Sequence, residues 1–163
     1  MIAFRASAAA RGVSALAPLV LLLAGCATPS GQAGYHPEQR SYLVTADPAA
    51  EVDAALVRAG ERGTRVLLVL GANWCHDSRA LAGWLATDRF RALVAERYEL
   101  VYVNVGMPQS GDGHNLAIAE RFGLTDLAST PALLVLTPAG TVVNPASARS
   151  WRNAASRSES AIY

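Results

Sequence analysis

The chain has 163 residues, enough for one domain with a sizeable apolar core. Its 14 basic residues, all arginine, nearly balance 13 acidic residues, and no basic stripe is present, so the charge pattern does not support nucleic-acid binding.

The N-terminus has the pattern of a processed export signal. Arg5 and Arg11 supply positive charge, and residues 13–24 form an apolar stretch too short to span a bilayer stably. It ends in Leu-Ala-Gly-Cys, which resembles the lipobox of bacterial lipoproteins. This predicts that residues 1–25 are removed and that Cys26 is lipidated. The alternative is an ordinary secretory signal that contains a cysteine by chance.

The residues after Cys26 predict how the protein is anchored. Residues 28–34 are small and polar, so residues 26–40 are expected to be a lipidated cysteine and a flexible tether. Ala27 follows the cysteine, and in Gram-negative lipoproteins this resemblance favours the outer membrane. We therefore expect a lipid-anchored protein of the bacterial envelope that faces the periplasm.

Residues 41–163 predict one α/β domain in which helices alternate with strands. The first helix begins at Asp47-Pro48, and wholly apolar runs such as 66–70 suit a strand covered on both faces. This order favours a mixed sheet with helices on both faces. The predicted helices cover 48–62, 75–86, 89–97 after an Asp88 cap, 115–122 and 150–161, and the predicted strands cover 66–70, 98–105, 132–136 and a hairpin return at 141–143.

Cys75 is the strongest candidate for a chemically reactive residue. It follows the apolar strand 66–70 and begins a helix, where unpaired N–H groups and the helix dipole favour thiolate over thiol. A protonated His76 would add to this effect, whereas an Asp77 carboxylate aimed at the sulfur would oppose it. Ser78 lies three residues on and could donate a hydrogen bond to the thiolate.

The segment Val-Leu-Gly-Ala-Asn-Trp-Cys-x-x-Ser, ending at Ser78, resembles the active-site segment of thioredoxin-like proteins. Thr130-Pro131, directly before an apolar strand, resembles the cis-proline loop of that family. The resemblance implies a thioredoxin-like three-layer fold over residues 41–163. It also implies that Pro131 faces Cys75, and that Trp74 and Thr130 help to bind a partner.

The sequence departs from the thioredoxin pattern at two positions. Ser78 replaces the second cysteine, and Val69 stands where many thioredoxins keep a buried acid. A serine cannot resolve a mixed disulfide, so this motif cannot cycle through a disulfide of its own. Since lipid would block Cys26, Cys75 would be the one free thiol of the mature chain.

These features predict thiol–disulfide exchange, with partners that are envelope proteins carrying disulfides or free thiols, or a small thiol such as glutathione. The alternative is a non-catalytic adaptor or chaperone-like module that grips an extended peptide, so enzyme activity stays open. A third interpretation is oxidation of Cys75 to sulfenic acid by peroxide. Arg79 is four residues away and could approach the sulfur, but only its spacing in the sequence suggests this. No cofactor is expected, and His36, His76 and His114 lack metal-ligand spacing. The redox interpretation requires a sulfur that solvent reaches and that lies beside residue 131.

Overall fold

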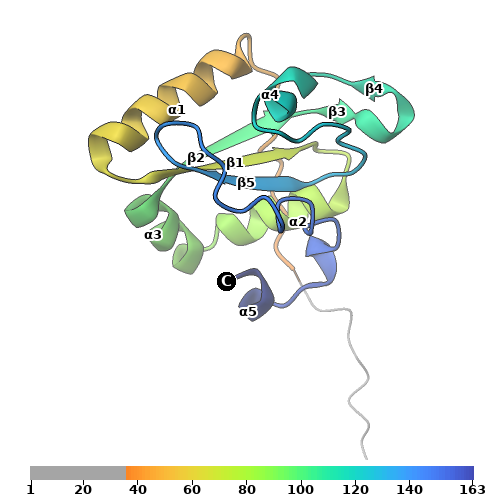
Figure 1. Ribbon diagram of the computed structural model, residues 1–163. Helices are drawn as coiled ribbons and strands as arrows, with labels where there is room; N and C mark the ends of the chain where they lie inside the picture. Colours follow the sequence, from red (N-terminus) through yellow and green to blue (C-terminus); the bar gives the residue numbers. More distant parts are fainter. Residues whose placement is uncertain (1–35) are drawn as a thin grey trace, which may run out of the picture. The chain divides into compact units, whose positions relative to one another are not determined.

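The computed structural model describes residues 36–163. The predicted signal peptide, Cys26 and most of the predicted tether lie outside the described residues. Residues 36–163 fold into a mixed sheet with helices on both faces, as the sequence predicted (Figure 1). Within this range, no helix is both long and apolar enough to cross a membrane.

The elements follow the predicted order closely. The helices are α1 (Pro48–Arg62), α2 (His76–Leu85), α3 (Asp88–Arg97), α4 (Leu116–Arg121) and α5 (Glu159–Ile162), with single 3₁₀ turns at η1 (Pro108–Ser110) and η2 (Ala154–Ser156). The strands are β1 (Arg65–Gly71), β2 (Tyr98–Asn104), β3 (Gly106–Met107), β4 (Asp112–Gly113) and β5 (Ala132–Leu136).

The main sheet has the strand order β2-β1-β5, with β1 parallel to β2 and antiparallel to β5. In this register Gly71 pairs with Asn104, and the preceding Leu70 pairs with Ala132. The end of β1 therefore lies beside the start of β5. As a result, the loop that contains Cys75 and the loop that contains Pro131 meet at one edge of the sheet.

Two apolar cores cover the two faces of the sheet. Figure 1 shows α1 and α4 on one side of the sheet and α2 and α3 on the other. Because side chains alternate along a strand, neighbouring residues of β1 serve opposite cores. Val66, Leu68 and Leu70 pack with α1 and α4. Leu67 and Val69 pack with α2, α3 and the C-terminal segment. Burial on both sides explains why β1 reads as an uninterrupted apolar run.

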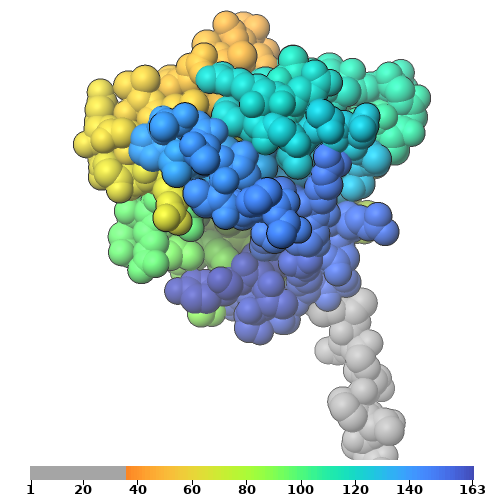
Figure 2. All heavy atoms as spheres, in the orientation of Figure 1, coloured from red at the N-terminus to blue at the C-terminus, as the bar shows by residue number. Residues whose placement is uncertain are grey.

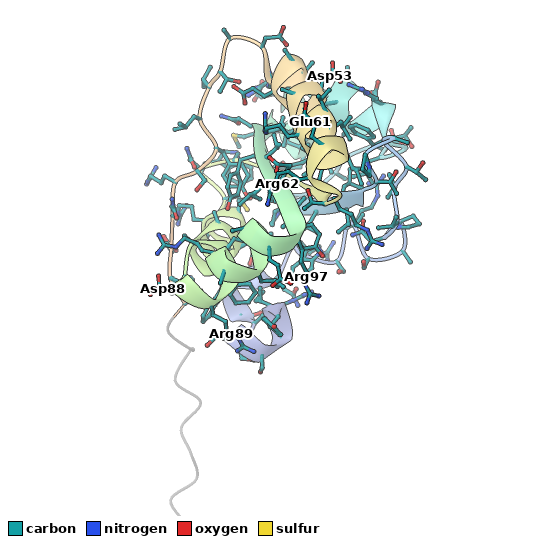
Figure 3. All side chains as sticks on the ribbon, turned by 90° about the vertical axis from the view of Figure 1, so that its left-hand side faces the viewer. Asp53, Glu61, Arg62, Asp88, Arg89 and Arg97 are labelled. Atoms are coloured by element: carbon teal, nitrogen blue, oxygen red, sulfur yellow. The ribbon has the colours of Figure 1, made fainter. Side chains whose placement is uncertain are left out.

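Helix α1 has the predicted boundaries. The Asp47 side chain accepts a hydrogen bond from the Ala50 N–H at 2.9 Å, and Gly63 ends the helix with a φ of +66°. Arg58 and Arg62 both bind the Glu99 carboxylate of β2, the former at 2.8 Å. Figure 3 labels Arg62 near the C-terminal end of α1. The helix is thus tied to the sheet by charge as well as by apolar packing.

Three segments have other lengths or bounds than predicted: the hairpin after β5, residues 106–113 and the start of α3. The predicted return strand is reduced to one bridge, between Leu136 and Val142. Residues 106–113, which lie outside the predicted helices and strands, contain the short pair β3–β4. Helix α3 begins at Asp88, with Thr87 at its N-cap, one residue earlier than predicted.

The predicted closing helix over residues 150–161 is wrong. This segment is a run of turns that ends in η2 and α5, and the chain after β5 spreads over the face shown in Figure 2. Serine side chains bond to the backbone there: the Ser150 hydroxyl donates to the Ser147 carbonyl at 2.8 Å, and the Ser156 hydroxyl donates to the Asn153 carbonyl at 2.9 Å. The Ala155 N–H is also diverted, because it donates to Asp77 Oδ1 at 2.8 Å.

Candidate active site around Cys75

Cys75 and the loop before β5 are in direct contact. Cys75 occupies the N-cap position of α2, and its N–H donates to the Ala72 carbonyl at 3.1 Å. Its thiol donates a hydrogen bond to the Thr130 carbonyl, with 3.4 Å between Sγ and the oxygen. The peptide bond between Thr130 and Pro131 is cis. Two motifs separated by 55 positions are therefore brought together by the sheet register.

The sulfur is placed beside residue 131 but is well shielded. Cys75 as a whole is 7% exposed. Its side chain makes no capping hydrogen bond to α2, contrary to the expectation that the helix N-terminus would hold the sulfur. The sulfur lies against the Thr130 carbonyl, which is its hydrogen-bond acceptor. The resting site is thus a thiol with restricted access, and reaction requires that the thiol leave its bond to Thr130.

Ser78 is a buried structural residue in this arrangement. It has no exposed surface, and its Oγ lies 3.4 Å from the Ala72 N–H, which donates to it. The Tyr42 hydroxyl donates to the Ser78 carbonyl at 3.3 Å. Within residues 36–163 no hydrogen bond joins Ser78 to Cys75, so the predicted donation to the sulfur is not formed. The hydroxyl instead helps to hold the loop after β1.

Gly71 makes this close packing possible. A Cβ on Gly71 would lie 2.6 Å from two ring atoms of Tyr42 and 2.8 Å from Ser78 Oγ. Tyr42 itself is 1% exposed, and burial raises the pKa of its hydroxyl well above the usual value. The phenol therefore stays neutral and acts as a hydrogen-bond donor behind the loop of residues 72–75, which we call the active-site loop.

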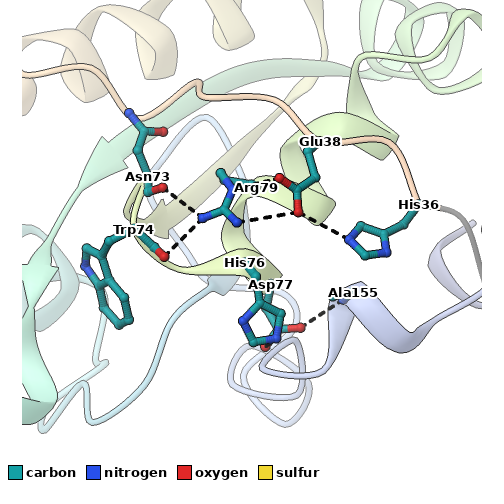
Figure 4. Close-up of polar contacts among 8 residues, drawn as sticks. All are labelled: His36, Glu38, Asn73, Trp74, His76, Asp77, Arg79 and Ala155. Atoms are coloured by element: carbon teal, nitrogen blue, oxygen red, sulfur yellow. Dashed lines mark hydrogen bonds and ion pairs between the residues drawn. The ribbon is translucent and has the colours of Figure 1, made fainter. Parts of the chain in front are cut away.

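Trp74, His76 and Asp77 have distinct surroundings. The Trp74 indole N–H donates to the Gly106 carbonyl at 2.8 Å, and 47% of the residue is exposed. His76 Nε2 lies 3.4 Å from Asp77 Oδ2 on an exposed side chain. The other Asp77 oxygen accepts from the Ala155 N–H (Figure 4). Trp74 thus links the motif to the chain at Gly106, while Asp77 links it to the C-terminal segment.

Several residues that support the site were not predicted from the sequence. The Asn73 amide donates to the Tyr42 carbonyl at 2.8 Å and accepts from the Tyr42 N–H at 3.2 Å. Arg79 binds the carbonyls of Asn73 and Trp74 and the carboxylate of Glu38 (Figure 4). Asn73 directly precedes Trp-Cys, so its place in the motif could have identified it as a supporting residue. No local sequence pattern indicates that Glu38 and Tyr42 contact this loop.

Residues 36–163 contain no cluster of three His, Cys, Asp or Glu side chains that could hold a metal ion. The groups that the described site brings together are the Cys75 thiol, the Thr130 carbonyl and the cis peptide to Pro131.

A family model described as thioredoxin-like matches residues 47–138, which include both motifs. The chain belongs to the thioredoxin-like family. Its structure is similar to the crystal structure of a disulphide isomerase from Xylella fastidiosa Temecula1, with a TM-score of 0.68 and 32% sequence identity over 77% of this chain and 92% of that one. None of the curated proteins matches the chain. This thioredoxin-like domain thus brings Cys75 to the Thr130 carbonyl beside the cis peptide, with Ser78 three residues after the cysteine.

Proposed function

We propose that this protein carries out thiol–disulfide exchange through Cys75 alone, forming a mixed disulfide with a partner. Its family membership and its similarity to a disulphide isomerase support a role of the thiol–disulfide oxidoreductase type. The observation that carries the proposal is the contact of Cys75 Sγ with the Thr130 carbonyl, beside the cis peptide to Pro131.

The proposed reaction starts when the Cys75 thiol loses its proton to solvent. The thiolate attacks one sulfur of a partner disulfide, so that a new S–S bond forms as the old one breaks. The second partner sulfur leaves as a thiolate and takes up a proton. Cys75 is the free cysteine among the described residues, and Ser78 cannot complete a second attack. Release therefore needs another thiol, from the partner or from a small molecule such as glutathione.

The proposed location is the bacterial envelope. The lipobox at Cys26 and the tether that follows support anchoring through lipid, with the domain facing the periplasm. Suitable partners there are envelope proteins that carry disulfides or free thiols. Disulfides persist in this oxidising compartment, so substrates for exchange are available.

The test is a reaction of the processed full-length protein with a model disulfide peptide, without reductant. The expected product is a mass increase equal to one half of the peptide, attached at Cys75 and released by glutathione. C75S should give no adduct, and S78A should still form it, because Ser78 supplies no sulfur. If wild-type Cys75 reacts no faster than the same thiol in denaturant, the exchange proposal is wrong.

A non-catalytic adaptor is the second candidate, and the shielding of the sulfur favours it. A thiol that is 7% exposed and bonded to Thr130 reacts only after it is released. An adaptor would bind extended peptides without using the sulfur. The C75S variant separates the two: capture of envelope partners that persists under reducing conditions supports the adaptor, and capture that is lost with the thiol supports exchange.

A further inference from the structure

Residues 37–42, which we call the arm, cross behind the active-site loop and contact it through polar groups. The Gln39 N–H donates to the Arg79 carbonyl at 3.0 Å. Asn73 pairs its amide with both backbone groups of Tyr42. The Pro37 carbonyl lies so close to Gly83 that a Cβ there would be 2.2 Å from its oxygen. The arm is thus packed along α2 at defined positions, so residues 37–40 do not belong to a flexible tether as predicted.

Arg79 joins the arm to the residues that precede the nucleophile. Its Nη1 donates to the Asn73 carbonyl at 3.1 Å and to the Trp74 carbonyl at 3.0 Å. Its Nε and Nη2 bind the two carboxylate oxygens of Glu38 at 2.9 and 3.5 Å (Figure 4). The arginine fork thereby spans from the arm to the residue next to Cys75. The Arg79 side chain is only 19% exposed, so water replaces these partners incompletely.

We propose that Arg79 is a positioning residue for the reaction of Cys75, and that Glu38 holds its guanidinium on the two carbonyls. This inference rests on the proposed exchange function. The Cys75 N–H is bonded to Ala72 and its carbonyl to the Arg79 N–H, so the turn moves as one unit. Loss of the guanidinium leaves the Asn73 and Trp74 carbonyls without their donor. A small displacement of this turn moves Sγ out of line with a partner disulfide, which slows the attack.

The experiment measures the second-order rate constant of Cys75 with a neutral aromatic disulfide. It uses the processed full chain and expresses the rate per folded molecule and per thiolate. Circular dichroism gives the folded fraction, and thiolate absorbance gives the ionised fraction. We expect R79Q to lower the rate constant about tenfold, since misplacement of a reacting group is costly. R79K should lose less, because lysine can still donate to a carbonyl.

Two controls match the charge changes at other positions: R40Q removes a positive charge, as R79Q does, and E61Q removes a negative charge, as E38Q does. Arg40 lies on the arm and Glu61 on α1, both are exposed, and neither makes a side-chain hydrogen bond or ion pair within the described residues. R40Q and E61Q should therefore react as wild type. E38Q should lower the rate constant less than R79Q, because Arg79 then keeps its carbonyl partners but loses its anchor.

A charge swap separates positioning from simple attachment of the arm. In E38R/R79E the ion pair can form again, but a glutamate cannot donate to the Asn73 and Trp74 carbonyls. We expect the swap to recover the stability of the fold and to leave the rate constant low. A swap that restores the rate, or an R79Q rate within about twofold of wild type, overturns the inference. If wild-type Cys75 is itself no faster than in denaturant, the exchange proposal and this inference fall together.

Discussion

Gly83→Ala tests whether the arm is packed on α2 as described. In an open helix interior this change stabilises by about 1 kcal/mol, because alanine has the better helix propensity. At Gly83, however, the added Cβ would lie 2.2 Å from the Pro37 oxygen and 2.7 Å from the Glu38 nitrogen, while ordinary contacts begin near 3.4 Å. The arm must therefore retreat by about 1 Å, since backbone atoms cannot rotate away as a side chain can.

The net effect of G83A follows from three contributions. Overpacking costs about 1–3 kcal/mol. The displaced arm weakens the hydrogen bond from Gln39 to Arg79, a bond worth about 1 kcal/mol. The helix propensity gain offsets about 1 kcal/mol of this. We expect G83A to lower the free energy of unfolding by about 1–3 kcal/mol.

Gly60→Ala in α1 is the matched control. Its Cβ would lie 3.7 Å from Pro138 Cβ, an ordinary contact, so we expect a gain of about 0.5–1 kcal/mol. Urea unfolding followed by circular dichroism measures both variants. Opposite signs for the two substitutions support the described packing. Equal stabilisation by G60A and G83A would refute it.

Three further predictions concern the site and the charged residues around it. S78C should supply a resolving thiol, so that oxidation gives a disulfide with Cys75; thiol titration checks this, and two thiols that stay free would contradict it. Arg58 and Arg62 lower the pKa of the Glu99 carboxyl, so its contribution to stability is present above the usual value of 4.5 and is lost as the pH falls. Urea midpoints of wild type should therefore drop more steeply on acidification than those of E99Q, and parallel slopes would argue against the pairing. Burial raises the pKa of Tyr102 from 10.0 to about 12, so about 3 kcal/mol of stability is present below pH 10 and lost as the pH rises to 12. Y102F should flatten this alkaline decline, and an unchanged decline would exclude Tyr102 as its source.

The sequence predicted the parts of the fold that depend on local pattern. The apolar run of β1 and the cap and proline of α1 are short-range signals, and both elements have close to the predicted bounds. The meeting of Cys75 and Thr130 was available through the order of the two motifs and the family resemblance.

The sequence did not predict the contacts that support the site from a distance. Glu38 and Arg79 are 41 positions apart, and the arm has no hydrophobic period that would place it. The C-terminal segment 150–161 is predicted as a closing helix but does not form one. The Ser150 and Ser156 hydroxyls bond to backbone carbonyls instead, and the Asp77 carboxylate accepts a hydrogen bond from the Ala155 N–H. Such competition depends on tertiary neighbours and is not visible in a local window.

The position of β1 has a consequence for how the domain opens. It is the one strand of the three-stranded sheet with a hydrogen-bonded neighbour on each side, and all its residues after Arg65 are buried. Backbone amides in such a strand exchange with solvent only when the whole domain unfolds. The loop to Cys75 starts directly at the end of β1. The backbone that supports the thiol is therefore expected to be among the most slowly exchanging of the described residues. In the proposed exchange reaction, a partner would therefore meet a thiol whose supporting strand stays closed through many encounters.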